Sequence, residues 1–136
     1  MAQVVDFKGN QYVFSNGTAH VEVVYDFSKD AGAVGVLDLI QVKEAMVLES
    51  AYVKVNTTAT SGGSATVIVG VVGGDTDAIL DATSGAVASL VAGVVLPGET
   101  ASVALKLDAD AKIGMTIGTA ALTAGKITVV MKLAQF

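Results

Sequence analysis

Hydrophobic and polar residues alternate along several short stretches of this chain. Where every second residue is apolar, one side of an extended strand is apolar and the other is polar, which is the pattern of a half-buried β-strand. Five stretches follow this pattern: residues 20–27, 48–56, 65–71, 102–108 and 126–133. In the second stretch, Glu49 is the one charged residue on the side of Val53 and Val55. The pattern predicts five half-buried strands.

Turn-forming residues separate these stretches. They include Gly9-Asn10, Asn16-Gly17, the run SGGS at residues 61–64, Gly73-Gly74, Pro97-Gly98 and Ala124-Gly125. Many short strands joined by such turns are typical of β-sandwiches and β-barrels. We therefore predict an all-β fold, an antiparallel β-sandwich of the jelly-roll type with one short helix. At 136 residues the chain has the length of one domain, and we expect residues 1–136 to form it.

Residues 70–85, with the sequence GVVGGDTDAILDATSG, combine a double glycine with Asp75, Asp77 and Asp81. A phosphate loop, a calcium loop and a turn that leaves a strand are the three alternatives. A phosphate loop needs a lysine and a hydroxyl beside its glycines, where this segment has carboxylates. The three aspartates could supply some of the roughly six to eight oxygens that calcium binds, but the closing glutamate of an EF-hand is missing. We favour the third alternative, in which the aspartates cap a short helix over residues 75–82.

Most of the apolar residues are small. Valine, alanine and glycine make up 59 of the 136 residues, the hydrophobic fraction is 52%, and the mean hydropathy is +0.64. Burial between subunits would account for so much apolar content in a small chain. Residues 86–96 form the best candidate for a membrane span, but they are far fewer than the ~20 residues that a spanning helix needs. We therefore expect no membrane partner, and residues 1–11 also lack the pattern of a signal peptide.

The charged residues argue against nucleic acid as a partner. The net charge is −5, and all eight basic residues are lysines. The chain therefore lacks arginine, whose side chain makes bidentate contacts to phosphates and base edges. Its lysines are spaced singly along the sequence, so no basic cluster would attract an acidic partner. We expect attachment to any partner to be mainly apolar, with weak salt dependence.

No group of residues indicates catalysis. His20 is the one histidine, and it lies on the polar side of its predicted strand. The chain has no cysteine and no G-x-S-x-G motif, so the usual nucleophiles of hydrolases are missing. It also has no tryptophan with which a glycosidase could stack a sugar. We expect the protein to be no enzyme and to hold no cofactor.

Three segments resemble a known family. They are DLIQVKEAMVLESAYVKV at residues 38–55, SGGSATVIVGVVGGDTDAILDAT at residues 61–83 and LTAGKITVVMKL at residues 122–133. In this order they are similar to the small all-β virion proteins that are found beside the major capsid gene in tailed bacteriophages. In that family a D-L-I-x-V strand is followed by an S-A-T-x-x-V-G strand, a D-x-D-x-x-L segment and an L-T-A-G-K strand. The resemblance covers roughly two-thirds of the chain.

The resemblance implies a function that composition alone does not. It implies a decoration or cement protein that binds the outside of the phage head, bridges neighbouring subunits and stabilises the capsid lattice. The expected partners are the major capsid protein and other copies of the chain, in a homotrimer at a local three-fold position. The expected location is the exterior of the capsid in the virion.

The N-terminal segment, residues 1–14, is a candidate for an extended arm that attaches to the capsid. The candidate contact residues are Val4, Val5, Phe7, Tyr12 and Phe14. They flank the Gly9-Asn10 break, and such a segment could add a strand to the sheet edge of a neighbouring subunit. The alternative is that the segment forms the first pair of strands of the sandwich itself.

An adhesive or carbohydrate-binding module of a phage fibre or cell surface is the alternative function. Sandwich folds carry that function in many proteins, so the fold does not decide between the two. Sugar binding usually requires an exposed aromatic platform. Tyr12, Tyr25 and Tyr52 fall on separate predicted strands, and Tyr25 falls on an apolar side. This scatter favours the capsid function.

Overall fold

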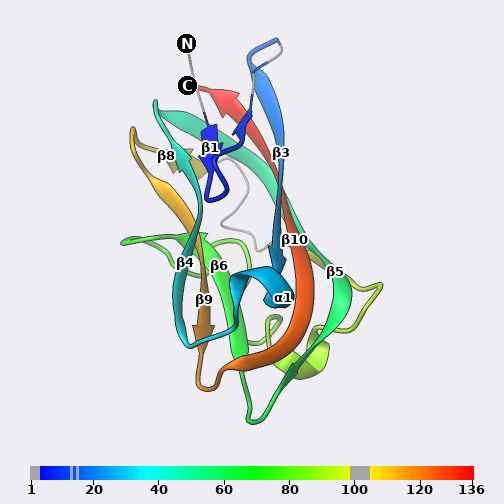
Figure 1. Ribbon diagram of the computed structural model, residues 1–136. Coiled ribbons are helices and arrows are strands. Elements are labelled where there is room, and N and C mark those ends of the chain that lie inside the picture. The colour runs from blue at the N-terminus through cyan, green and yellow to red at the C-terminus, as the bar shows by residue number, and fades with distance from the viewer. Residues whose placement is uncertain (1–3, 13, 15, 99–104) are drawn as a thin grey trace.

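Two antiparallel β-sheets pack face to face in the computed structural model, which describes residues 4–12, 14, 16–98 and 105–136 (Figure 1). The first sheet has the strand order β2-β1-β4-β9-β6, and the second has the order β3-β10-β5-β7, with β8 also paired to β5. The strands are β1 (Val4–Asp6), β2 (Gln11–Tyr12), β3 (Thr18–Asp26), β4 (Gly35–Val42), β5 (Met46–Ser61), β6 (Thr66–Val71), β7 (Val95–Pro97), β8 (Leu105–Leu107), β9 (Lys112–Gly118) and β10 (Leu122–Gln135). The prediction of an all-β antiparallel sandwich is confirmed.

Successive strands alternate between the two sheets. From β2 to β7 every connection crosses to the other sheet, and the chain crosses again before β9 and before β10. As a result β10 lies between β3 and β5, while β9 lies between β4 and β6 (Figure 1). This interleaving is that of a jelly roll, and the hairpin β1–β2 extends the first sheet beyond β4.

The predicted alternation places the core residues correctly. On β3, Val21, Val23 and Tyr25 are at most 2% exposed. Their neighbours on β10 face the same core, because Val129 lies opposite Val23 and also opposite Val53 of β5. Other predicted inward positions are also buried, namely Val67, Val69, Leu107, Ile127, Met131 and Leu133. Val103, which the same pattern placed inward, lies outside the described residues.

A β-bulge changes the expected position of Glu49. Leu133 of β10 lies opposite Leu48, and Lys132 lies opposite Ser50, so Glu49 is the extra residue of β5. Leu48 therefore occupies the inward position, with 0% exposure, and Glu49 is only half-buried. Its Oε1 atom is nevertheless buried, and it has no hydrogen-bond partner in the described part of the chain. The period of two predicts the faces of a strand only as far as the next bulge.

The predicted helix over residues 75–82 is wrong. This segment forms turns, and the described helical segments are α1 (Phe27–Asp30) and the 3₁₀ turn η1 (Val87–Ser89). The turns lie along the outer edge of β6: Val67, Val69 and Val71 donate their N–H groups to the carbonyl oxygens of Gly85, Leu80 and Asp75. A sheet edge with unpaired backbone groups competes with helix formation for hydrogen bonds. Here the segment bonds to the edge of β6 and forms no helix.

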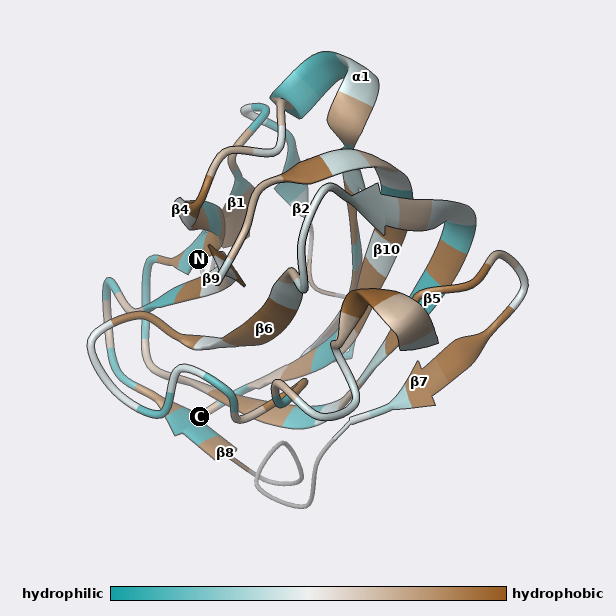
Figure 2. Cartoon of the chain, turned by 90° about the horizontal axis from the view of Figure 1, so that it is seen from below, coloured by the Kyte–Doolittle hydropathy of each residue, from teal (hydrophilic) through white to brown (hydrophobic). Residues whose placement is uncertain are grey.

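The short helix α1 follows β3 directly. The Asp26 side chain accepts a hydrogen bond from the Ser28 N–H, which is a standard N-cap. Ala31 has a φ of 63°, a left-handed conformation that ends the helix after four residues. Figure 2 shows α1 largely polar, in contrast to the apolar β6 and β7. Among the described residues, no helix has both the length and the apolar character needed to cross a membrane.

Candidate functional site

The N-terminal hairpin β1–β2 contains four of the five candidate contact residues. Val4 is 0% exposed and pairs with Tyr12 on one side and Val42 on the other. Val5, Phe7, Tyr12 and Phe14 are half-buried, and Phe7, Tyr12 and Phe14 pack against the core. The structure therefore places the segment in the first sheet as its edge hairpin. Of the five candidates, Val4 has no surface to offer a partner.

Asp6 holds this hairpin together. Its Oδ1 atom accepts hydrogen bonds from the backbone N–H groups of Lys8 and Asn10, both at 2.9 Å. Its Oδ2 atom lies 3.0 Å from the Asn10 side-chain nitrogen and 3.0 Å from the Tyr12 hydroxyl. Burial alone would raise the pKa of Asp6, but the hydrogen bonds from Asn10, Tyr12 and Lys8 outweigh it and lower that pKa. The sequence pattern did not predict this role of Asp6. The spacing of Asp6, Asn10 and Tyr12 around a glycine could have indicated it.

Tyr12 also joins the hairpin to the second sheet. Its hydroxyl lies 2.9 Å from the backbone carbonyl oxygen of Glu22 on β3. Burial raises the pKa of Tyr12 to about 12, and the hydrogen bond and negative charge of Asp6 add to the effect. At the turn of the hairpin, the Lys8 Nζ atom lies 3.7 Å from an Asp30 carboxylate oxygen of α1. The hairpin is thus tied to β3 of the second sheet and to α1.

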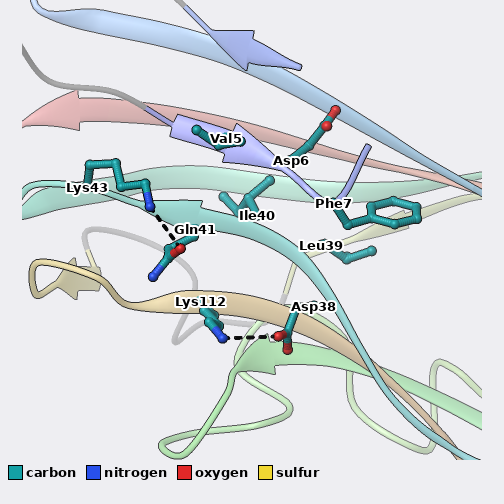
Figure 3. A pocket seen from close by; sticks show the side chains of 9 residues that line it. All are labelled: Val5, Asp6, Phe7, Asp38, Leu39, Ile40, Gln41, Lys43 and Lys112. Carbon is teal, nitrogen blue, oxygen red and sulfur yellow. Dashed lines mark hydrogen bonds and ion pairs between the residues drawn. The ribbon is translucent and has the colours of Figure 1, made fainter. Parts of the chain in front are cut away.

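A shallow hollow of about 250 Å³ lies beside this hairpin (Figure 3). Its lining residues are Val5, Asp6, Phe7, Asp38, Leu39, Ile40, Gln41, Lys43 and Lys112. Lys112 is 3.3 Å from Asp38, and Lys43 is 3.1 Å from the Gln41 side-chain oxygen. The Asp6 carboxylate points away from the Asp38–Lys112 pair in this view. The lining contains neither a histidine nor a hydroxyl side chain, and its mixture of apolar and charged residues offers a contact surface of mixed polarity.

Residues 70–85 carry the three aspartates that were considered as metal ligands. A hydrogen bond with Asp75 raises the pKa of Asp77, with burial and the Asp75 charge as smaller causes. Asp81 accepts a hydrogen bond from the Ser84 N–H at 2.8 Å. No three acidic or histidine side chains within the described ranges come together as metal ligands. The structure therefore does not bring Asp75, Asp77 and Asp81 together around one point.

On the outer face of the second sheet, polar side chains lie around a buried apolar residue of β10. His20 is exposed there, with its Nε2 atom 3.9 Å from Glu22. Glu22 forms an ion pair of 3.0 Å with Lys54, and this hydrogen bond and charge lower the pKa of Glu22. Glu22 lies opposite Val130 and Lys54 lies opposite Thr128, so their ion pair crosses β10 diagonally, and both β10 residues are at most 5% exposed. The ion pair covers this part of β10. As an exposed pair it contributes only ~0–1 kcal/mol to stability.

The tyrosines do not form a platform in this structure. Tyr25 is 2% exposed, with its hydroxyl bonded to the Ala31 carbonyl oxygen. Tyr12 is half-buried in the hairpin, and Tyr52 lies on β5 with 37% exposure. The exposed large apolar residues of the described chain are mainly valines: Val34, Val36, Val72, Val91 and Val95. Strand β4, which carries Val36, was not among the predicted alternating stretches, although its Val-Leu-Asp-Leu pattern at residues 36–39 has the period of two.

Comparisons with solved structures find two similar chains. A chain of the cyanophage Pam1 capsid asymmetric unit superposes with a TM-score of 0.61 at 12% sequence identity, covering 91% of this chain and 90% of that one. A chain of the acid-stable capsid structure of Helicobacter pylori bacteriophage KHP30 superposes with a TM-score of 0.59 at 14% identity, covering 98% and 93%. At these identities the likeness establishes a shared fold. No family model and no curated protein matches the sequence.

Proposed function

We propose that this chain is a structural component of a phage head, a decoration or cement protein that binds the outside of the capsid and stabilises its lattice. The observation that carries the proposal is the shared fold with chains of two phage capsid structures over nine-tenths or more of both partners. The sequence resemblance to small virion proteins points the same way from independent features. The partner is the major capsid protein, and the role is structural, without catalysis.

The surface of the molecule supports a binding role. Val34, Val36 and Val95 are each close to 60% exposed, and all three lie on or beside strands at or near sheet edges. Apolar residues with this exposure are candidates for contact with another protein. The hairpin residues Val5, Phe7, Tyr12 and Phe14 offer further partial surface. In this proposal they contact the capsid as part of a rigid hairpin.

The proposal includes a homotrimer. The chain is unusually rich in apolar residues, and a trimer would bury part of them between its subunits. Permanent subunit interfaces are apolar in the same way. A closed ring would also cover sheet edges that otherwise invite aggregation. Sedimentation of the purified chain at micromolar concentration should give the mass of three copies. A stable monomer under those conditions would overturn the trimer.

Binding to heads tests the function directly. Heads of the phage that encodes this chain, prepared without it, are mixed with the purified protein and sedimented. We expect saturable binding and an increase in the temperature at which the heads break open. Binding should persist at about 1 M salt, where the Debye length is ~3 Å and exposed charge pairs are screened. Absence of binding, together with a specific hit on a glycan array, would favour the adhesive function instead.

A further inference from the structure

Strand β4 is paired along its whole length on one side but only along half of it on the other. On the β9 side, pairs run from Gly35 opposite Ile117 to Gln41 opposite Lys112. On the β1 side, pairs cover only the last three residues of β4, and one more hydrogen bond joins the Phe7 N–H to the Leu39 carbonyl oxygen. The hairpin then turns away, and residues 35–38 are left as a sheet edge.

The alternation of hydrogen bonds shows which backbone groups this edge presents. Because Val67 and Val69 bond outward to the loop that covers β6, the intervening residues of β6 bond to β9. The same alternation across β9 directs Gly35 and Leu37 towards β9, and Val36 and Asp38 away from it. Within the described ranges, the backbone N–H and C=O groups of Val36 and Asp38 have no hydrogen-bond partner there.

Both sides of this edge provide apolar surface. Between the sheets lies a hollow of about 230 Å³, lined by Tyr25, Asp30, Ala31, Ala33, Val34, Gly35, Val36, Leu37 and Ile117. On the outer face lies a smaller hollow of about 120 Å³, lined by Val36, Gly70, Val72, Gly73, Thr76, Gly114 and Thr116. Successive side chains of a strand point to opposite faces. An added strand would therefore place one side chain in the inner hollow and the next beside Val36.

Two other edges of the sandwich are wholly or partly covered by the chain itself. The outer edge of β6 is bonded by residues 75–87. The edge of β3 is interrupted where Tyr12 meets the Glu22 carbonyl and where the Asp30 carboxylate accepts from the Asp26 N–H. At residues 35–38 of β4 the described chain supplies no such cover, and Val34 and Val36 are 58% and 59% exposed. Proteins usually protect such an edge unless it pairs with another chain.

We infer that residues 35–38 of β4 are the site at which an extended segment of a neighbouring capsid subunit adds a strand to this protein. The segment is about three to five residues long, has apolar side chains on both faces, and bonds to the backbone of Val36 and Asp38. A second copy of this chain fits less well, because antiparallel pairing of two such edges about Leu37 would set each Val36 opposite an Asp38 carboxylate. Each Leu37 also already packs in its own core. The inference rests on the proposed function for the identity of the partner.

Hydrogen exchange on the free and head-bound protein tests this inference. The amide protons of Val36 and Asp38 should exchange fast in the free chain and become protected when the protein binds heads prepared without it. The amides of Gly35 and Leu37 serve as an internal reference, because they are bonded to β9 in both states. Binding without new protection at Val36 and Asp38 would overturn the inference and leave the proposed function standing.

The substitution Val36→Lys provides a second readout, with Val95→Lys as its matched control. Both valines are exposed to nearly the same extent, at 59% and 58%, and Val95 lies on β7 of the other sheet. We expect Val36→Lys to weaken binding to heads by at least about tenfold with an unchanged melting temperature, and Val95→Lys to weaken it far less. Equal affinities of the two variants would contradict the inference. If the unsubstituted protein fails to bind heads, both the proposed function and the partner assigned here are overturned.

Discussion

The hydroxyl oxygen of Tyr12 lies 2.9 Å from the backbone carbonyl oxygen of Glu22, and this contact joins the edge hairpin of one sheet to the edge strand of the other. The same hydroxyl is 3.0 Å from Asp6, which organises the hairpin. One phenol group therefore connects the local structure of residues 4–12 to the packing of the two sheets. Removal of this hydroxyl therefore affects both the hairpin and the packing of the two sheets.

Replacement of Tyr12 by phenylalanine should lower the free energy of unfolding by about 1 kcal/mol, the net value of a typical hydrogen bond. The aromatic ring stays in place, so the loss reports on the hydroxyl alone. Tyr52→Phe is the matched control, because the Tyr52 hydroxyl makes no hydrogen bond within the described chain. Urea denaturation of both variants measures the difference. Equal stabilities would show that the Tyr12 contact contributes nothing.

Stability should fall in alkaline solution because of the same group. The pKa of Tyr12 is raised from 10.0 to about 12, so the folded state keeps its proton where the unfolded state has lost it. Its contribution is therefore fully present below pH 10 and is lost as the pH rises from 10 towards 12. The pKa of Tyr25 is also raised by burial, so it adds to the loss. Denaturant midpoints across this range should fall less steeply in Tyr12→Phe than in the unsubstituted chain.

Deletion of residues 2–8 distinguishes the edge hairpin from a detachable arm. The deletion removes the fully buried Val4 and the carboxylate of Asp6, and it exposes the end of β4 that pairs with β1. We expect the truncated chain to be unfolded or strongly destabilised, as judged by circular dichroism and thermal melting. A truncated chain that keeps its fold but no longer binds heads would instead support the attaching arm.

Replacement of Gly85 by alanine should detach the loop that covers β6. A Cβ atom at this position would lie 1.7 Å from the Val67 carbonyl oxygen, so the backbone must move. We expect the free energy of unfolding to fall by about 1–3 kcal/mol, the range for overpacked positions. Gly62→Ala is the control, since a Cβ atom there meets nothing within 4 Å. A Gly85→Ala variant as stable as Gly62→Ala would contradict the close packing of this loop on β6.

The sequence by itself determined which side of β3, β6 and β10 faces the core, and of β5 after its bulge. Alternation in residues 20–27 and 126–133 is a local property, and burial of valine is favourable in any sandwich, so these positions were predictable. The turns at Gly9-Asn10 and Gly73-Gly74 were predictable for a similar reason, because glycine relieves local backbone strain. The bulge at Glu49 was not, since it depends on the register with β10.

Only the tertiary structure decided what lies beside each strand. The pattern of side chains reports the two faces of a strand and carries no information on its two lateral edges, where the backbone makes its hydrogen bonds. The edge of β6 therefore bonds with residues 75–87, and the helix predicted over residues 75–82 does not form, although its aspartates could have capped it. For the same reason the sequence could not show that Tyr12 reaches Glu22, or that Val36 and Asp38 present an open edge. Strand order depends on long-range pairing, and that pairing determined the candidate site.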